Sequence, residues 1–310
     1  MKLTYNWKIA GHSAKVAELE KEILENRLSH AYLFSGPEQV GKYTVAKTMA
    51  GIVQCPNGYC HECATCREIE KGYHADTIEI ADNGESIKVD EVRDLIAKLN
   101  MSSTSPRKIM LIRNAERMTT EAANAMLKTL EDPPDGVMFL MTASRVREIL
   151  PTIISRVRMY VFQRLPEQKI LELLQSLYPL AEVDLLEQVA SYALGRPGRA
   201  VKFMREPELL EEARKMYNDI SAFVKKPDRM GEFAYADHIA KVMKERESDK
   251  PLNDFLDTFT AVLRAKMLEQ DNGPERMRTL NLLGEVQQSR DLVKRNVNTK
   301  LLLENLMLKL

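Results

Sequence analysis

Short apolar runs and amphipathic stretches alternate through the first half of the chain. Continuous apolar runs at 31–34, 109–112 and 137–141 are typical of strands that are buried on both faces of a parallel sheet. The segments 78–80 and 87–89 alternate apolar with polar residues, so we expect them to form short strands as well. These runs predict the strands of one sheet.

Helical periodicity fills the segments between these runs. Apolar residues recur at helical spacing in 16–28, 43–53 and 90–99. Thr119 has a side chain suited to cap a further helix that stops before a Pro-Pro pair. That helix is expected to bury Ala122, Met126, Leu127 and Leu130. Strands that alternate with helices predict an α/β domain with a parallel sheet, to which we assign residues 1–164.

Strand signals fade after residue 164, and helical patterns take their place. Short helical patterns in 165–206, interrupted at Gly195-Arg-Pro-Gly198, predict a small helical second domain. From 207 to 310 nearly every segment is amphipathic, with loops expected near 225–228 and 271–274. This last part predicts a helical bundle as a third domain.

Composition narrows the class of protein without naming it. A chain of 310 residues exceeds what one hydrophobic core usually organises, and 44% hydrophobic residues with only 6% aromatics fit a helix-rich globular protein. The 45 Lys and Arg residues equal the 45 Asp and Glu residues, so the chain lacks the basic excess of many nucleic-acid-binding proteins. No run suits a membrane helix and the first residues lack the apolar block of a signal peptide, so we expect a cytoplasmic protein without membrane contact.

The best-defined motif is Gly36-Pro-Glu-Gln-Val-Gly41-Lys42, which fits the phosphate-binding P-loop spacing G-x-x-x-x-G-K. In such a loop, backbone N–H groups surround the phosphates and the Lys neutralises them. The predicted strand before it and helix after it favour this interpretation over an ordinary glycine-containing turn. A Ser or Thr should follow to ligate Mg²⁺, but Tyr43 stands there and Thr44 comes one residue late. Binding of ATP or ADP is left open.

The strand predicted at 109–112 also lacks what hydrolysis requires. A P-loop ATPase places an acidic residue at the end of a buried strand to hold Mg²⁺, usually with a neighbouring carboxylate that activates water. Arg113 and Asn114 occupy those positions here, and we interpret Glu116 as a solvated loop acid. Together with Tyr43, these residues predict that hydrolysis fails even if a nucleotide binds.

All four cysteines lie close together, at Cys55, Cys60, Cys63 and Cys66. The spacing C-x₄-C-x₂-C-x₂-C allows four thiolates to surround one tetrahedral Zn²⁺, and a closed Cys₄ site is structural. An iron–sulfur cluster and free structural thiols are the alternatives. His61 is interpreted as a bystander because four Cys complete the metal shell.

Several motifs together resemble the bacterial clamp-loader AAA+ subunits. They are Arg27-Leu-Ser-His-Ala-Tyr-Leu-Phe-Ser-Gly-Pro37, the cysteine module after the P-loop helix, Ala125-Met-Leu-Lys-Thr-Leu-Glu-Asp-Pro-Pro134 and Ser155-Arg156-Val157. The resemblance spans at least residues 5–200, and the ending from Asn296 onward is similar to the family's collar domain. It implies an α/β AAA+ P-loop core with an inserted zinc module at 55–66, a helical lid and an all-α collar that assembles with other subunits.

Within that family the chain resembles the delta-prime branch, whose members lack the acidic pair and the hydroxyl that hydrolysing gamma/tau subunits keep. The resemblance implies that Arg156 is an arginine finger, which stabilises phosphoryl-transfer charge in a neighbour's ATP site. Val157 departs from the family's Ser-Arg-Cys pattern. A surface salt bridge is the alternative role for this arginine.

The resemblance also assigns nucleotide-contacting positions. Arg199 matches the sensor arginine of the lid and joins Gly36, Gly41, Lys42 and Thr44 in the predicted nucleotide-binding set. Two further matches carry less weight. They are the sensor-1 segment 142–144 and the adenine-covering stretch with Trp7 and Ile9.

The implied function is membership of the DNA polymerase III clamp loader. The implied partners are gamma/tau, delta, the sliding clamp and, through the complex, primer-template DNA. Two alternatives remain from the sequence: an active clamp-loader ATPase of the gamma/tau type, and a nucleotide-independent DNA-binding or regulatory module built on a decayed P-loop fold.

Overall fold

The computed structural model describes residues 4–7, 9–80, 83–99, 101, 103, 105–246, 248–293 and 297–310. The chain divides into two compact units, the first made of residues 1–186 with 195–200 and the second of residues 187–194 with 201–310. The finer division at residues 164 and 206 stays a prediction.

The first unit is built around a five-stranded parallel sheet with the strand order β2-β3-β4-β1-β5. The strands are β1 Ala31–Ser35, β2 Thr77–Ile80, β3 Lys108–Ile112, β4 Val137–Ala143 and β5 Arg158–Val161. In the central register, Leu33 of β1 pairs with Met141 of β4 and with Met159 of β5. The predicted α/β domain with a parallel sheet is confirmed.

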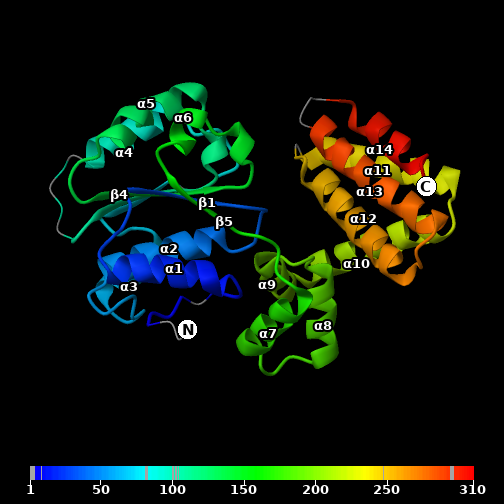
Figure 1. The fold of residues 1–310 in the computed structure, drawn as a ribbon, viewed down its shortest axis with the longest axis horizontal. Helices are drawn as coiled ribbons and strands as arrows, with labels where there is room; N and C mark the ends of the chain where they lie inside the picture. Colours follow the sequence, from blue (N-terminus) through cyan, green and yellow to red (C-terminus); the bar gives the residue numbers. More distant parts are fainter. Residues whose placement is uncertain are drawn as a thin grey trace. The chain divides into compact units, whose positions relative to one another are not determined.

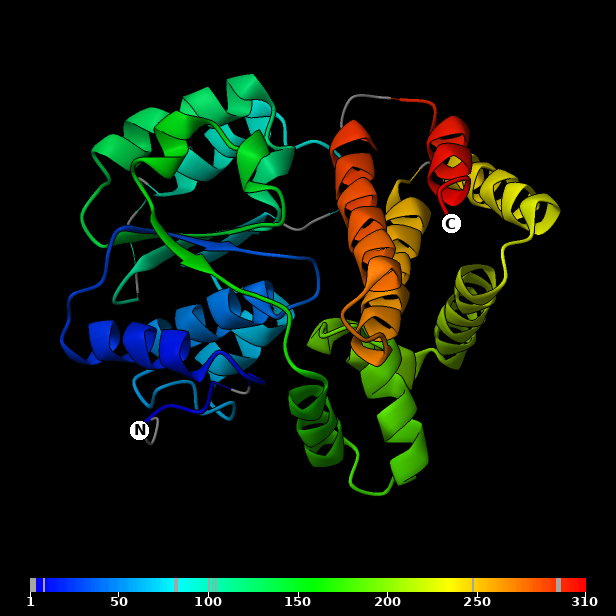
Figure 2. The same cartoon turned by 45° about the vertical axis from the view of Figure 1, so that its right-hand side comes forward.

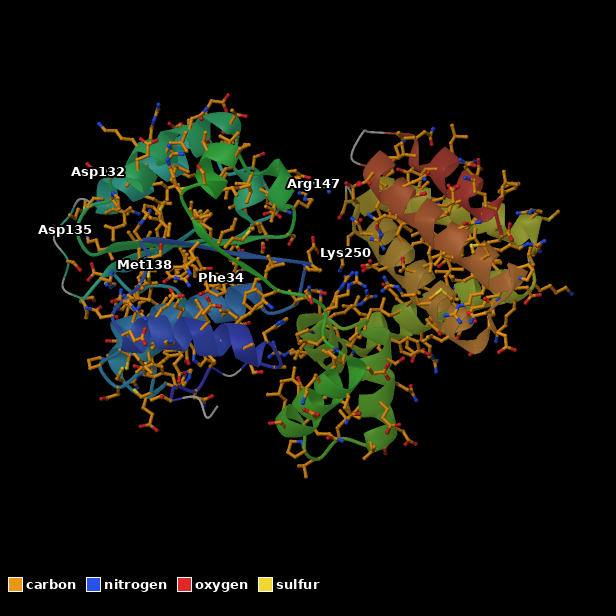
Figure 3. The ribbon with its side chains drawn as sticks, viewed as in Figure 1. Phe34, Asp132, Asp135, Met138, Arg147 and Lys250 are labelled. Carbon is orange, nitrogen blue, oxygen red and sulfur yellow. The ribbon has the colours of Figure 1, made fainter. Side chains whose placement is uncertain are left out.

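Helices cover both faces of this sheet (Figures 1 and 2). One face carries α1 Ser13–Leu24, α2 Lys42–Gln54 and α3 Ala64–Lys71, and the other carries α4 Val89–Leu99, α5 Thr120–Glu131 and α6 Pro151–Ile154. Successive strand residues point to opposite faces, so Phe34 packs in the core beneath α1 and α2 while Leu33 packs in the core on the other face. Figure 3 labels Phe34 and Met138, which belong to the same core.

One predicted strand is wrong. Ile87 forms only an isolated bridge to Met118, and Val89 already begins α4. The Glu91 carboxylate accepts a hydrogen bond from the backbone N–H of Lys88 at 2.8 Å. This contact satisfies a free N–H at the start of a helix, as in one half of a capping box, and it favours helix over strand here.

Thr119 caps α5 as predicted, because its Oγ1 accepts a hydrogen bond from the N–H of Ala122 at 3.2 Å.

Strand β5 has no clear apolar pattern in the sequence, since only Tyr160 of its four residues is buried. Two short 3₁₀ turns, η1 Ala115–Arg117 and η2 Val146–Glu148, follow β3 and β4.

From residue 167 to the end, the described chain is helical. The helices are α7 Glu167–Leu177, α8 Val183–Tyr192, α9 Pro197–Arg205, α10 Pro207–Lys225, α11 Arg229–Arg246, α12 Lys250–Glu269, α13 Pro274–Val293 and α14 Thr299–Met307. The loops predicted near 225–228 and 271–274 are confirmed. A further break before α12, where Pro251 lies in the first turn, was not predicted. Asn298 caps α14, whereas Asn296 lies outside the described residues.

The second unit has its own core, centred on Phe255 and Phe259 of α12. A charged pair lies beside it: the Arg290 guanidinium donates to the Asp257 carboxylate at 2.7 Å, and Asp257 is buried. Among the described residues, the helices lack an apolar stretch long enough to cross a bilayer.

Candidate functional site

The P-loop segment joins the carboxyl end of β1 to the start of α2 (Figure 1). This arrangement confirms the predicted strand-loop-helix context. Two positions in it require glycine. A side chain on Gly36 would place its Cβ 2.1 Å from the carbonyl oxygen of Phe162, and Gly36 has φ +141°. Gly41, directly before α2, has φ +98°. The backbone of Phe162 therefore closes directly against the start of the loop.

Lys42 is buried at the start of α2, and its ammonium group is hydrogen-bonded within the protein. Nζ donates to the carbonyl oxygens of Gly36 and Pro37 at 2.6 Å each and to Oγ of Ser144 at 2.9 Å. Burial lowers the pKa of Lys42 to about 8, while the nearby carboxylates of Glu116 and Glu38 oppose that shift. The three protons of the ammonium thus have three acceptors from the chain itself.

Glu116 lies in this network, and its interpretation as a solvated loop acid is wrong. Its Oε1 accepts hydrogen bonds from the N–H groups of Ser144 at 2.9 Å and Arg145 at 3.3 Å. Its Oε2 is buried and has no hydrogen-bond partner in the described part of the chain. The cause is local: Asn114 adopts φ +52°, and the 3₁₀ turn after it folds Glu116 back towards the end of β4.

Two of the three positions that depart from a hydrolysing P-loop enzyme, Tyr43 and Arg113, contact each other. The guanidinium of Arg113 lies 4.2 Å from the centroid of the Tyr43 ring, at cation–π distance. The Tyr43 hydroxyl donates to Oε2 of Glu79 on β2 at 2.9 Å. Burial, together with this hydrogen bond, raises the pKa of Tyr43. Thr44 is exposed on the first turn of α2.

The segment 195–200 packs against the P-loop segment and is hydrogen-bonded to it. The N–H of Gly198 donates to the carbonyl of Gln39 at 2.8 Å, and the N–H of Leu165 donates to the carbonyl of Gly195 at 2.8 Å. Arg196 and Arg199 are both buried in this segment. The charge of Arg196 contributes to the lowered pKa of Lys42, so it lies within electrostatic reach of the loop. Sequence reasoning selected Arg199 and missed Arg196.

The four cysteine thiols converge as predicted. Sγ of Cys55 lies 3.8 Å from Sγ of Cys60 and 3.7 Å from Sγ of Cys63. Sγ of Cys60 lies 3.9 Å from Sγ of Cys66. All four sulfurs lie within 4.8 Å of one another. Four thiolates about 2.3 Å from one tetrahedral ion would be separated by roughly 3.8 Å, so the donor set and spacing fit a single Zn²⁺.

The cysteine module is attached directly to the P-loop helix. Cys55 is the C-cap of α2, and Cys63 caps the start of α3 by accepting from the N–H of Cys66. His61 pairs through Nδ1 with Glu70 at 2.5 Å and is not part of the cluster formed by the described cysteines.

Comparison with known proteins places these features in a family. The family model described as "DNA polymerase III, delta subunit" matches residues 11–166, half of the chain. The chain belongs to that family. The clamp-loader resemblance predicted from the sequence motifs is thereby confirmed at family level.

The DNA polymerase III relatives include more than one kind of subunit. Subunit tau of Bacillus subtilis is 32% identical over 278 residues, which cover 84% of this chain and 47% of the relative. Subunit delta' of the same organism is 35% identical over 156 residues, covering 49% of this chain and 47% of the relative. Subunit gamma of Buchnera aphidicola is 34% identical over 196 residues, covering 60% of this chain and 54% of the relative. These alignments span about half the length of each relative.

A solved structure of a DNA polymerase III gamma subunit-related protein from Thermotoga maritima has the same fold. Its TM-score is 0.51 at 22% sequence identity, and the match covers 93% of this chain and 97% of that chain. The architecture expected from the motifs, an α/β core with a parallel sheet followed by helical parts, is confirmed.

Two predicted residues of the DNA polymerase III family pattern lie away from the loop contacts. Trp7 is buried in the core, and its Nε1 donates to Glu20 at 2.9 Å. Arg156 follows α6 at the surface, where Nη1 donates to the carbonyl of Thr152 at 2.7 Å and Nη2 pairs with Glu131 at 2.5 Å. Glu131 belongs to the Leu-Glu-Asp-Pro-Pro stretch of the sequence motif, but sequence reasoning gave it no role.

Proposed function

We propose that this family member is a delta-prime-type clamp-loader subunit, which takes part in the ring without hydrolysing ATP itself. The contact between Tyr43 and Arg113 carries the proposal. Where a hydrolysing subunit has a hydroxyl and a carboxylate that converge on Mg²⁺, this chain has an aromatic ring and a cation in contact. Asn114 stands where the carboxylate that activates water is needed.

Hydrolysis is tested by measuring phosphate release from the purified chain with ATP and Mg²⁺. We expect no turnover above that of a Lys42→Ala control. Clear turnover that Lys42→Ala abolishes would favour the second candidate, an active ATPase of the gamma/tau type. That candidate is supported by the intact spacing from Gly36 to Lys42 and by the long alignment with a tau subunit.

Assembly is tested separately by mixing the chain with gamma/tau and delta and analysing the mixture by size exclusion. A co-eluting pentamer supports a role in loading the sliding clamp onto primed DNA. A decayed P-loop module that binds DNA or regulates another protein would elute apart from gamma/tau and delta, whichever nucleotide is added.

Arg156 is the residue that we propose to act in trans, as an arginine finger. It lies at the surface with its guanidinium already oriented by the carbonyl of Thr152 and the carboxylate of Glu131. The guanidinium of an arginine is planar and permanently charged, so it can stabilise the negative charge that develops on a transferred phosphoryl group. Arg156→Ala should leave assembly intact and reduce ATP turnover of the complex. An unchanged rate would contradict this role.

The remaining ligand assignments belong to the same proposal. Cys55, Cys60, Cys63 and Cys66 hold structural Zn²⁺ rather than an iron–sulfur cluster, since a cluster would place its iron atoms between the thiolates and separate them further. Gly36, Gly41, Lys42 and Arg199 are proposed to contact ATP or ADP, with Thr44 the weakest member because it is exposed. The cytoplasm remains the predicted compartment, 165–206 the predicted lid and 207–310 the predicted collar.

A further inference from the structure

Arg113 directly follows β3 at the carboxyl ends of the parallel strands, the end of the sheet from which the P-loop segment leaves. The N–H donors of its guanidinium are not used in hydrogen bonds among the described residues. Its backbone N–H continues the sheet by donating to Ile80 at 3.3 Å. Its guanidinium stacks on Tyr43, and within the described residues it has no hydrogen bond or ion pair to an acceptor. A stacked guanidinium keeps its N–H groups in the plane of the fork, so they are available to a ligand.

The hydrogen-bond donors of Lys42, the cation within the loop itself, are by contrast all in use. Its three protons already bond to Gly36, Pro37 and Ser144. A phosphate must displace these acceptors before Lys42 can bind it. Arg113 has no such contacts to give up.

The same geometry disfavours a divalent metal. Magnesium is held at such loops by a hydroxyl after the Lys and by a carboxylate at the strand end, and it also bridges the phosphates. Here the Tyr43 hydroxyl is committed to Glu79, and the strand end carries the positive charge of Arg113. A divalent cation at this position would be repelled by the guanidinium and would lack both of these ligands.

We propose that this loop binds the polyphosphate of a nucleotide in its metal-free form, with the Arg113 guanidinium taking the place of the metal ion. The inference rests on the proposed loss of hydrolysis and deepens it. A planar fork pairs with two phosphate oxygens at once, and Tyr43 is the platform that holds it at the strand end. The nucleotide is then bound in a form from which phosphoryl transfer cannot proceed, because no metal neutralises the charge that develops.

The test is calorimetric titration of the full chain with ADP, once in EDTA and once in saturating Mg²⁺. Binding should be present in EDTA and should weaken in Mg²⁺, because the metal competes with Arg113 for the same phosphate oxygens. Arg113→Gln should weaken binding in EDTA by roughly 10- to 100-fold, the usual worth of hydrogen bonds to a charged group. Arg113→Lys keeps the positive charge but loses the planar guanidinium. Its affinity for ADP in EDTA should lie between those of the wild type and Arg113→Gln.

The matched control is Arg147→Gln. It removes the same charge from an exposed arginine of η2, labelled in Figure 3, and should leave ADP binding in EDTA unchanged. Binding that requires Mg²⁺, absence of ADP binding in EDTA, or equal losses in the two Gln variants would overturn the inference. If Arg113→Gln fails to fold, the wild-type comparison of EDTA with Mg²⁺ and the Arg113→Lys variant still decide it.

Failure of this inference is distinguishable from failure of the proposed function. A chain that co-elutes with gamma/tau and delta but binds no metal-free ADP refutes only the role of Arg113. A chain that hydrolyses ATP with Mg²⁺ refutes the proposed function itself.

Discussion

The guanidinium of Arg113 lies 4.2 Å from the ring centroid of Tyr43 and so joins the end of β3 to the first turn of α2. Two of the three residues that break the pattern of a hydrolysing P-loop enzyme therefore contact each other, and Asn114 is the third. The ring offers its face to the cation, and the strand end carries a positive charge where a hydrolysing enzyme has a metal-binding carboxylate.

A double-mutant cycle measures that contact. Arg113→Ala and Tyr43→Leu should show a coupling free energy of about 1 kcal/mol, within the range for cation–π pairs. Trp7, the sole tryptophan of the chain, is buried in the first unit and reports its urea unfolding by fluorescence. Tyr43→Phe keeps the ring face and should retain the coupling. A coupling near zero would show that the stacking has no energetic consequence.

The pH dependence of ADP binding should follow Lys42. Its pKa in the free loop is about 8, below the ordinary 10.5, and a bound phosphate would raise it by favouring the charged form. Affinity in EDTA should thus be flat below pH 8 and should fall by up to about tenfold per pH unit above it, because binding then requires proton uptake. Titrations between roughly pH 7 and pH 9.5 check this. Lys42→Met should bind weakly without this pH dependence, and affinity that rises with pH would contradict the assignment.

Glu131 should act as a positioning residue for Arg156. In the assembled complex, Glu131→Gln should reduce ATP turnover by less than Arg156→Ala does, with little change in the KM for ATP. Adding Glu131→Gln to Arg156→Ala should cause no further loss, because both act through the same guanidinium.

A matched control is Glu18→Gln, which removes the partner that lies 2.9 Å from Arg158 elsewhere in the same unit. That control should turn over like the wild type. Since Glu131 is about half exposed, its pair with Arg156 adds little stability, and the thermal unfolding of Glu131→Gln should match that of the wild type. Additive losses in the double variant would contradict the positioning role.

Metal analysis should find about one Zn²⁺ per chain and no acid-labile sulfide. Cys63→Ser should lose the metal and lower the stability of the first unit as read by Trp7, because the binding free energy of a structural metal is folding free energy. Ser103→Ala changes an exposed residue outside the module. This variant should keep both the metal and the stability of the first unit. Sulfide in stoichiometric amount would instead support the iron–sulfur alternative.

Two glycines should respond in opposite ways to alanine. On Gly51 of α2, a Cβ would lie 2.3 Å from the ring of Tyr59, so Gly51→Ala should destabilise the cysteine module and reduce its metal content. On Gly284 of α13, a Cβ meets nothing within 4 Å. Gly284→Ala should stabilise the second unit by up to about 1 kcal/mol through helix propensity. Circular dichroism follows both variants, and equal effects would contradict the packing described for Gly51.

The sequence pattern predicted most of the fold but only part of the site. Buried strands such as 109–112 are apolar throughout, and Thr119 and the cysteine spacing carry direct chemical signals. Strand β5 carries no apolar run of its own, because Met159 and Val161 are exposed on this edge strand. The alternation in 87–89 predicts a strand, but the capping contact between Glu91 and the N–H of Lys88 starts a helix there.

The network around Lys42 depends on contacts between distant residues, which no local pattern encodes. Ser144 reaches Lys42 across the end of the sheet, and Glu116 returns to it only because Asn114 adopts a left-handed conformation. The pairing of Glu131 with Arg156 is also set by tertiary structure, since it joins the end of α5 to the turn after α6. A close reading of Gly195-Arg-Pro-Gly198 could have found Arg196, because it stands within the same short motif as Arg199.

Helix α2 begins at Lys42 in the phosphate loop and ends at the cap residue Cys55. Its 13 residues span roughly 20 Å, so one stiff element connects the two candidate ligand sites. In genetic terms, we expect damage to either site to give the same phenotype. An allele that loses a cysteine should resemble one that damages the loop, although the altered residue is remote from any nucleotide, and a suppressor of either defect should be sought along the length of this helix.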